Sequence, residues 1–151
     1  MKSLLSLFLL FTAIQAVSAD VRLPDVLASS MVLQQKQAVP VWGTAEPGES
    51  ITVEFAGLKR NTVAGANGKW RVDLGKLAAS FKPQTMTIAG KNRIELTNIL
   101  VGEVWLVSGQ SNMQWWLPES TGGEAATAAA NHPNIRLFNV SREVAFKKKA
   151  G

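Results

Sequence analysis

One loop of the sequence has the composition expected of a serine hydrolase site. Ser111 lies in the polar loop Ser108–Asn112, which consists mainly of small residues and directly follows the continuous apolar run Val104–Val107. A buried strand that ends in such a loop fixes the backbone and exposes the serine Oγ, and amides near a following helix start can stabilise an oxyanion. Ser111 is therefore the candidate nucleophile. An ordinary loop serine or a helix cap is the alternative.

The residues around Ser111 differ from the nucleophile elbow of α/β-hydrolases. That elbow has the pattern Gly-x-Ser-x-Gly, whereas this chain reads Gly109-Gln110-Ser111-Asn112-Met113. The second glycine is absent, so the spacing does not predict an α/β-hydrolase elbow.

His132 is the only histidine of the chain and the only candidate for a neighbouring general base. It follows the expected helix Ala125–Ala130, near the amino end of the next strand, on the side of a βαβ unit opposite Ser111. We expect a residue of the helix-to-strand turn rather than a base. A serine without a base is a poor nucleophile.

The elements upstream of this loop read as short strands between turns. Ile51–Phe55 and Trp70–Leu74 alternate apolar and polar residues, which is the period of a half-buried strand. Glu46–Glu49 and Asn67-Gly68 have turn composition. About seven strands with turns every 8–12 residues or so predict an antiparallel β-sandwich.

The pattern changes after this sandwich. Val104–Val107 does not alternate, as expected of a strand covered on both faces in an α/β sheet. Ala125–Ala130 predicts a short helix that ends before Pro133, and Ile135–Val140 predicts a second strand. This order is the start of an α/β domain. Two parallel strands and one helix cannot cover their apolar faces, so we expect an incomplete domain.

Two tryptophans of the sandwich, Trp42 and Trp70, are expected in its core. A sugar-stacking surface is the alternative for both. Glu103, which precedes the apolar run, is expected to be a solvated carboxylate, and an interaction with the Ser111 loop is the alternative.

The first 19 residues resemble a secretory signal peptide. Lys2 precedes the apolar run Leu4–Ile14, and the small residues Val17-Ser18-Ala19 follow. The apolar run has 11 residues, too few to span about 30 Å of hydrocarbon as a helix. We expect cleavage after Ala19 and export to the periplasm or the extracellular space. The expected organisation is a signal peptide (1–19), a β-sandwich (20–100) and the start of a second domain (101–151).

The composition excludes several classes of protein. The chain has 151 residues, no cysteine and a formal charge of +5, so disulfide scaffolds and thiolate chemistry are excluded. The basic residues form no stripe interleaved with aromatic residues, and the Lys147–Lys149 run is expected to be solvated. We therefore expect no nucleic-acid partner and no membrane contact beyond export.

Several motifs together resemble one enzyme family. Val101–Met113 is similar to the first conserved block of sialate O-acetylesterases, members of the SGNH hydrolase superfamily. Further similar segments are Leu23-Pro24, Ser29–Gln34, Val41–Gly43, Gly68–Trp70 and Asn131–Phe138. The resemblance covers about residues 21–142 and implies an N-terminal β-domain followed by the start of an SGNH hydrolase domain.

The resemblance implies roles for individual residues. Ser111 would be the nucleophile, its backbone N–H one oxyanion donor, and Asn112 would help to position the loop. Independently of the resemblance, a tryptophan face can stack on a sugar ring, so we expect one of Trp115 and Trp116 to line the substrate cleft; packing of the β-domain against the catalytic domain is the alternative. The family's other oxyanion donors and its catalytic Asp and His lie in later blocks, whereas the last aspartate here is Asp73. No metal and no organic cofactor are implied.

The expected function is thus that of an exported carbohydrate esterase. Its substrate would be an O-acetylated sialic acid or a related acetylated sugar, and the 151-residue chain would be an inactive fragment. Two alternatives remain open. The chain could be a non-catalytic β-sandwich module for carbohydrate binding or adhesion, or a complete product whose apolar faces are covered by a partner.

Overall fold

A computed structural model describes residues 20–140. The expected signal peptide lies outside the described residues. The strands in this range are β1 (Val32–Gln34), β2 (Ala38–Thr44), β3 (Ser50–Phe55), β4 (Leu58–Val63), β5 (Lys69–Lys76), β6 (Ser80–Ala89) and β7 (Arg93–Gly102). Two 3-10 helices, η1 (Ser111–Gln114) and η2 (Leu117–Glu119), and one α-helix, α1 (Gly123–Ala129), follow.

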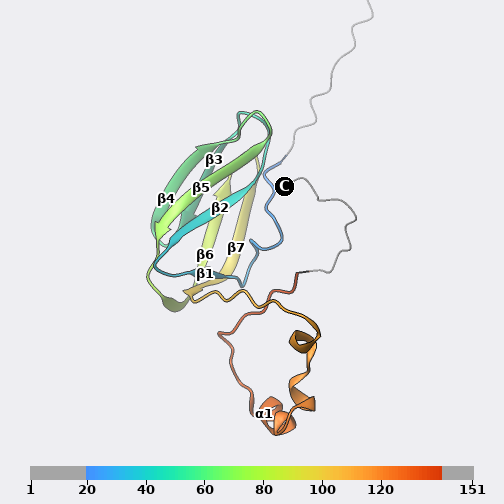
Figure 1. Ribbon diagram of the computed structural model, residues 1–151. Helices are drawn as coiled ribbons and strands as arrows, with labels where there is room; N and C mark the ends of the chain where they lie inside the picture. Colours follow the sequence, from blue (N-terminus) through green and yellow to red (C-terminus); the bar gives the residue numbers. More distant parts are fainter. Residues whose placement is uncertain (1–19, 141–151) are drawn as a thin grey trace, which may run out of the picture.

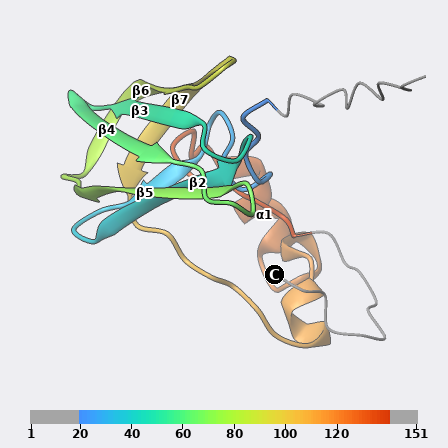
Figure 2. The same cartoon turned by 90° about the horizontal axis from the view of Figure 1, so that it is seen from above.

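The strands form two packed sheets, as the alternation predicted. One sheet has the order β1-β7-β6-β3-β4, and the second consists of β2 and β5 (Figure 1 and Figure 2). All pairs except one are antiparallel. The exception is β1, which pairs with β7 in parallel. A parallel neighbour needs a long crossover rather than a hairpin, and here the whole β-domain between Gln34 and Arg93 forms that connection.

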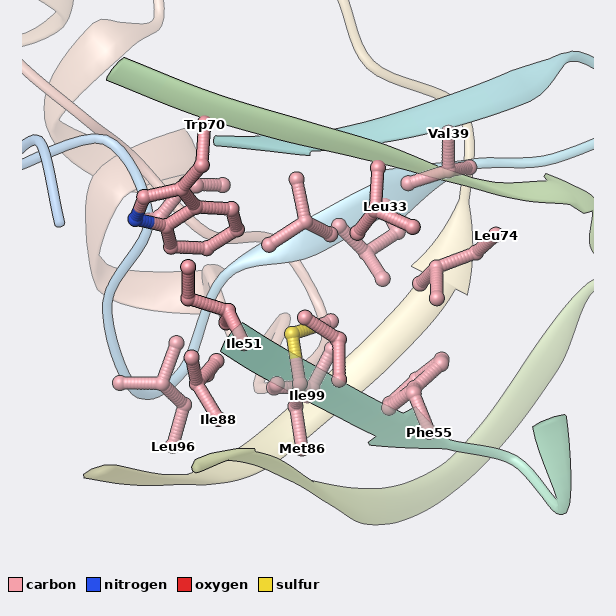
Figure 3. Close-up of a cluster of buried hydrophobic side chains, with 14 of the residues drawn as sticks. Leu33, Val39, Ile51, Phe55, Trp70, Leu74, Met86, Ile88, Leu96 and Ile99 are labelled. Carbon is pink, nitrogen blue, oxygen red and sulfur yellow. The ribbon is translucent and has the colours of Figure 1, made fainter. Parts of the chain in front are cut away.

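The core lies between the sheets and is built by the alternating strands. Ile51 and Phe55 of β3 and Leu74 of β5 point inward and are buried (Figure 3). Trp70 is also a core residue, with 3% of its surface exposed, as predicted. Apolar burial of this kind stabilises the fold by roughly 25 cal/mol per Å².

Trp42 is not a core residue, and that expectation is wrong. Its neighbour Val41 is completely buried, whereas 39% of Trp42 is exposed. Successive side chains of a strand point to opposite faces, so only one of the two can enter the core. Trp42 lies on the outer face of β2 as a consequence.

The turn residues behave as expected, and one glycine permits a close backbone contact. Gly48 and Gly68 have φ of +79° and +72°, which glycine adopts without strain. Gly43 pairs with Trp70 across the β2–β5 ladder. A Cβ on Gly43 would collide with the carbonyl oxygen of Arg22. This absence of a side chain lets the N-terminal segment bond to Thr44, whose N–H donates to the Arg22 carbonyl at 2.9 Å.

The chain between β7 and the end of the described range contains no further strand, so the two strands expected there do not form. Val104–Val107 and Ile135–Val140 form no strand. A strand needs a neighbour that takes its N–H and C=O groups, and residues 20–140 provide none at these positions. The expected helix is confirmed as α1. No helix in the described range is long and apolar enough to cross a membrane.

Replacement of Gly43 by Ala tests the Arg22 contact. The added methyl group meets the Arg22 carbonyl and approaches the Trp70 ring, so we expect a loss of about 2–3 kcal/mol in the free energy of unfolding. Urea denaturation measures this loss. Gly102→Ala is the control, because its Cβ would meet only Val32 at an ordinary 3.6 Å. Equal midpoints for the two variants would contradict the assigned contact.

Candidate active site

Ser111 begins a tight 3-10 turn. The N–H of Met113 donates to the carbonyl of Gln110 at 2.9 Å, and the N–H of Trp115 donates to that of Asn112 at 3.3 Å. These bonds close the turn and leave Ser111 at its first position, with an exposed side chain. The serine is therefore accessible to a reactant.

The glycine before this turn has a packing role. A Cβ on Gly109 would occupy the position of the Met113 side chain. Met113 thus folds back over Gly109, which accounts for glycine and methionine at the two ends of the pentapeptide. The fit shapes the loop that presents Ser111.

No general base lies next to Ser111 among residues 20–140. No hydrogen bond to its Oγ is formed by any described residue, and His132 is exposed, with its backbone carbonyl accepting from Ile135 at 3.0 Å. The described range also holds no group of three or more acidic or histidine side chains that could bind a metal. Hydrolysis by this loop would need a base from elsewhere.

The other predicted site residues lie in the same exposed segment. Asn112 belongs to η1 with Ser111, and Trp115 and Trp116 connect η1 to η2. Trp115 is 65% and Trp116 is 72% exposed among the described residues. Their predicted roles as cleft or packing residues stay predictions.

A large set of apolar side chains is exposed along this segment. The set consists of Val104, Trp105, Leu106, Val107, Met113, Trp115, Trp116, Leu117, Ile135, Leu137, Phe138 and Val140. So many exposed apolar side chains in one segment are typical of an interface. Figure 1 shows the segment extending from one end of the sandwich, with α1 farthest away.

A polar clasp, formed by Gln34, Gln35 and Glu103, lies where the chain leaves the β-domain. The side-chain amides of Gln34 and Gln35 donate to the two carboxylate oxygens of Glu103, at 2.9 and 2.6 Å. The side-chain oxygen of Gln34 also accepts the N–H of Val104 at 2.8 Å. Glu103 is thus no freely solvated carboxylate, and the clasp directs the chain toward Ser111. Sequence reasoning missed it.

The clasp lowers the pKa of Glu103. Hydrogen bonds from Gln34 and then Gln35 stabilise the charged carboxylate, and Lys36 adds a smaller favourable charge interaction. Hydrogen bonds to the charged form of an acid lower its pKa. The clasp is therefore fully formed only when Glu103 is ionised.

A second tie holds the other end of the exposed segment. The guanidinium of Arg136 donates to the backbone carbonyl of Ser30 and to the side-chain oxygen of Asn98, both at 3.3 Å. The side-chain amide of Asn98 in turn donates to the Ser30 hydroxyl at 2.9 Å. The segment that carries Ser111 is thus tied to the β-domain at both ends.

Known proteins similar to this chain include sialate O-acetylesterases. Sialate O-acetylesterase of Homo sapiens is 29% identical over 146 residues, which cover 88% of this chain and 28% of that protein. The Mus musculus enzyme of the same name is 30% identical over 133 residues, covering 80% of this chain and 24% of the relative. No protein-family model matches the chain.

A solved structure of a carbohydrate esterase is also similar to this chain. The crystal structure of a carbohydrate acetylesterase from Xanthomonas citri is 40% identical and superposes with a TM-score of 0.70. The match covers 74% of this chain and 26% of that structure. The resemblance to sialate O-acetylesterases is confirmed. The chain spans about a quarter of the length of these esterases.

Acid titration tests the clasp at the junction of this esterase-like chain. Because the pKa of Glu103 is lowered in the folded state, its stabilising contribution is present above the unfolded value of about 4.3 and is lost as the pH falls through the folded pKa. We expect the side-chain amide NMR signals of Gln34 and Gln35 to shift in that acid range.

Glu103→Gln removes the titrating charge and should abolish this pH dependence. Glu119→Gln is the matched control, since Glu119 lies in η2 away from the clasp. Signals of Gln34 that do not move during titration of the unsubstituted protein would contradict the clasp.

Proposed function

We propose that this chain is the part of a carbohydrate acetylesterase that supplies the nucleophile, Ser111. The observation that carries the proposal is the exposed Gly109–Met113 turn, with Ser111 at its first position, in a chain similar to sialate O-acetylesterases. The proposed substrate is an O-acetylated sialic acid or another acetylated sugar.

In the proposed reaction, Ser111 Oγ attacks the acetyl carbonyl carbon while a base takes the serine proton. The tetrahedral intermediate carries its negative charge on the former carbonyl oxygen, and the backbone N–H of Ser111 is one donor to that oxygen. Collapse of the intermediate breaks the bond to the sugar oxygen, which receives the proton, and leaves an acetyl-serine. Water then attacks the acetyl-serine in the same way and releases acetate.

The base is proposed to come from a His–Asp pair outside this chain. Two observations support a continuation beyond it. The chain spans about a quarter of its relatives' length, and its apolar side chains on both sides of the Ser111 turn are exposed. Exposed apolar surface of this extent is unfavourable in water. The proposal includes a division of the chain into a signal peptide (1–19), a β-sandwich (20–100) and the start of the catalytic domain (101–151). It also includes a role in substrate binding for Asn112, Trp115 and Trp116.

Export is proposed from the sequence of residues 1–19. A charged start, a short apolar centre and small residues before Asp20 support a cleaved signal peptide. Amino-terminal sequencing of the protein from its native host would give Asp20 as the first residue.

The serine is tested in the protein that includes the proposed continuation. Ser111→Ala should abolish hydrolysis of 4-nitrophenyl acetate, with a loss of kcat of at least about 10³-fold, because the covalent step has no replacement. Ser108→Ala is the matched control in the same loop and should keep most of the activity. Full activity of Ser111→Ala with an unchanged circular dichroism spectrum would refute the assignment.

The 151-residue chain gives a separate test of the proposed continuation. We expect it to bind a hydrophobic dye strongly and to hydrolyse 4-nitrophenyl acetate no faster than its own Ser111→Ala variant, since no base lies next to Ser111 among residues 20–140. Polar replacement of two exposed residues, Leu106→Gln and Leu137→Gln, should reduce dye fluorescence. A compact monomer that binds no dye would contradict the exposed surface.

A non-catalytic role in carbohydrate binding is the second candidate function of the β-domain. The half-exposed Trp42 on its outer face favours this role.

A further inference from the structure

The outer face of β2 and β5 carries a groove that contains an aromatic ring and cations. Trp42 and Arg71 are direct partners in the β2–β5 ladder and therefore share this face. Arg22, Lys69, Thr62 and Asn67 also line the groove, which has a volume of about 1020 Å³. Small-molecule sites typically have about 300–1,000 Å³. We name this feature the Trp42 groove.

The charged side chains that line the Trp42 groove are all basic. Its described lining includes Arg22, Lys69 and Arg71 but no Asp or Glu. Arg71 has an exposed partner, Asp73, at 3.3 Å, whereas Arg22 and Lys69 form no ion pair within residues 20–140. Arg22 and Lys69, two cations without a counter-charge in the described range, produce a positive potential that attracts an anion.

The aromatic ring of Trp42 does not belong to the core of the sandwich. Trp42 is 39% exposed and lies outside the buried cluster that holds the sheets together. An indole at a groove presents a flat apolar face with a polar N–H at its edge. A pyranose ring matches this combination, because its C–H groups form an apolar face and its hydroxyls form a polar rim.

We propose that the Trp42 groove binds a carboxylate-bearing saccharide. The sugar ring lies on the indole of Trp42, and the carboxylate is bound by Arg71 and Lys69. The planar guanidinium of an arginine suits a carboxylate because it can donate two parallel hydrogen bonds. Thr62 and Asn67 supply groups for sugar hydroxyls.

This site is separate from the Ser111 turn. Trp42 and Arg71 belong to the sandwich, whereas Ser111 follows β7 in the exposed segment. The inference rests on the proposed function only for the class of ligand, a sugar. Binding in the groove needs no ester and no nucleophile, so the two proposals can fail independently.

The test is an NMR titration of the ¹⁵N-labelled protein with 3′-sialyllactose and, separately, with lactose. The two probes differ by one carboxylate-bearing sugar, and neither carries an O-acetyl ester. We expect sialyllactose to shift the Trp42 indole signal saturably, with a dissociation constant of about 1 mM. Lactose should bind at least about threefold more weakly, and added salt should weaken only sialyllactose binding.

Variants separate stacking from charge. Trp42→Ala should weaken sialyllactose binding about tenfold, and Trp42→Phe should restore part of it. Arg71→Gln should reduce the preference for sialyllactose over lactose. Phe81→Ala is the control, because Phe81 is an exposed aromatic residue on β6 that does not line the groove.

Three results would overturn the proposal. They are equal affinity for lactose and sialyllactose, unchanged affinity in Trp42→Ala, and shifts confined to Trp115 and Trp116. Repeating the titration on the protein with its proposed continuation gives a fourth, since loss of the Trp42 shift there would mean that the groove faces the rest of the protein. Loss of esterase activity in Ser111→Ala changes none of these readouts.

Discussion

The parallel pairing of β1 with the end of β7 determines where the Ser111 segment leaves the β-domain. β1 has only three residues, and its last residue, Gln34, lies opposite Gly102. That register places the Gln34 side chain beside Glu103 and Val104, where it donates to the carboxylate and accepts the N–H. Without the pairing of β1 with β7, Gln34 would not be held beside the chain that follows Gly102. A strand about 70 residues earlier thus orients the candidate nucleophile loop.

The same N-terminal segment fixes the far end of the Ser111 segment. Ser30 accepts from Arg136 through its carbonyl and from Asn98 through its hydroxyl. Ser30 and Asn98 have φ of +67° and +59°, a left-handed conformation that is uncommon outside glycine. These hydrogen bonds offset the cost of that conformation. The motif Ser29–Gln34 therefore acts on both ends of the segment, which gives a physical reason for its occurrence alongside Val101–Met113.

Sequence patterning predicted the sandwich because strands such as β3 and β5 alternate apolar and polar residues on their own. The alternation in β3 and β5 identified Ile51, Phe55 and Trp70 as core residues, and the structure has them buried. Trp42 was misassigned because Pro40-Val41-Trp42 is apolar at three consecutive positions, so the period does not choose the inward face. The three-residue β1 is too short for its period to be recognised.

The candidate site was harder to predict because its elements depend on distant neighbours. Val104–Val107 has the composition of a strand that is covered on both faces. Such a strand forms only where other elements cover it, and the composition of the segment does not show whether they are present. The clasp joins Gln34 to Glu103 across 69 positions, and only the sheet order brings them together. The identity of Ser111 could be inferred from its loop, whereas the direction of that loop required the topology.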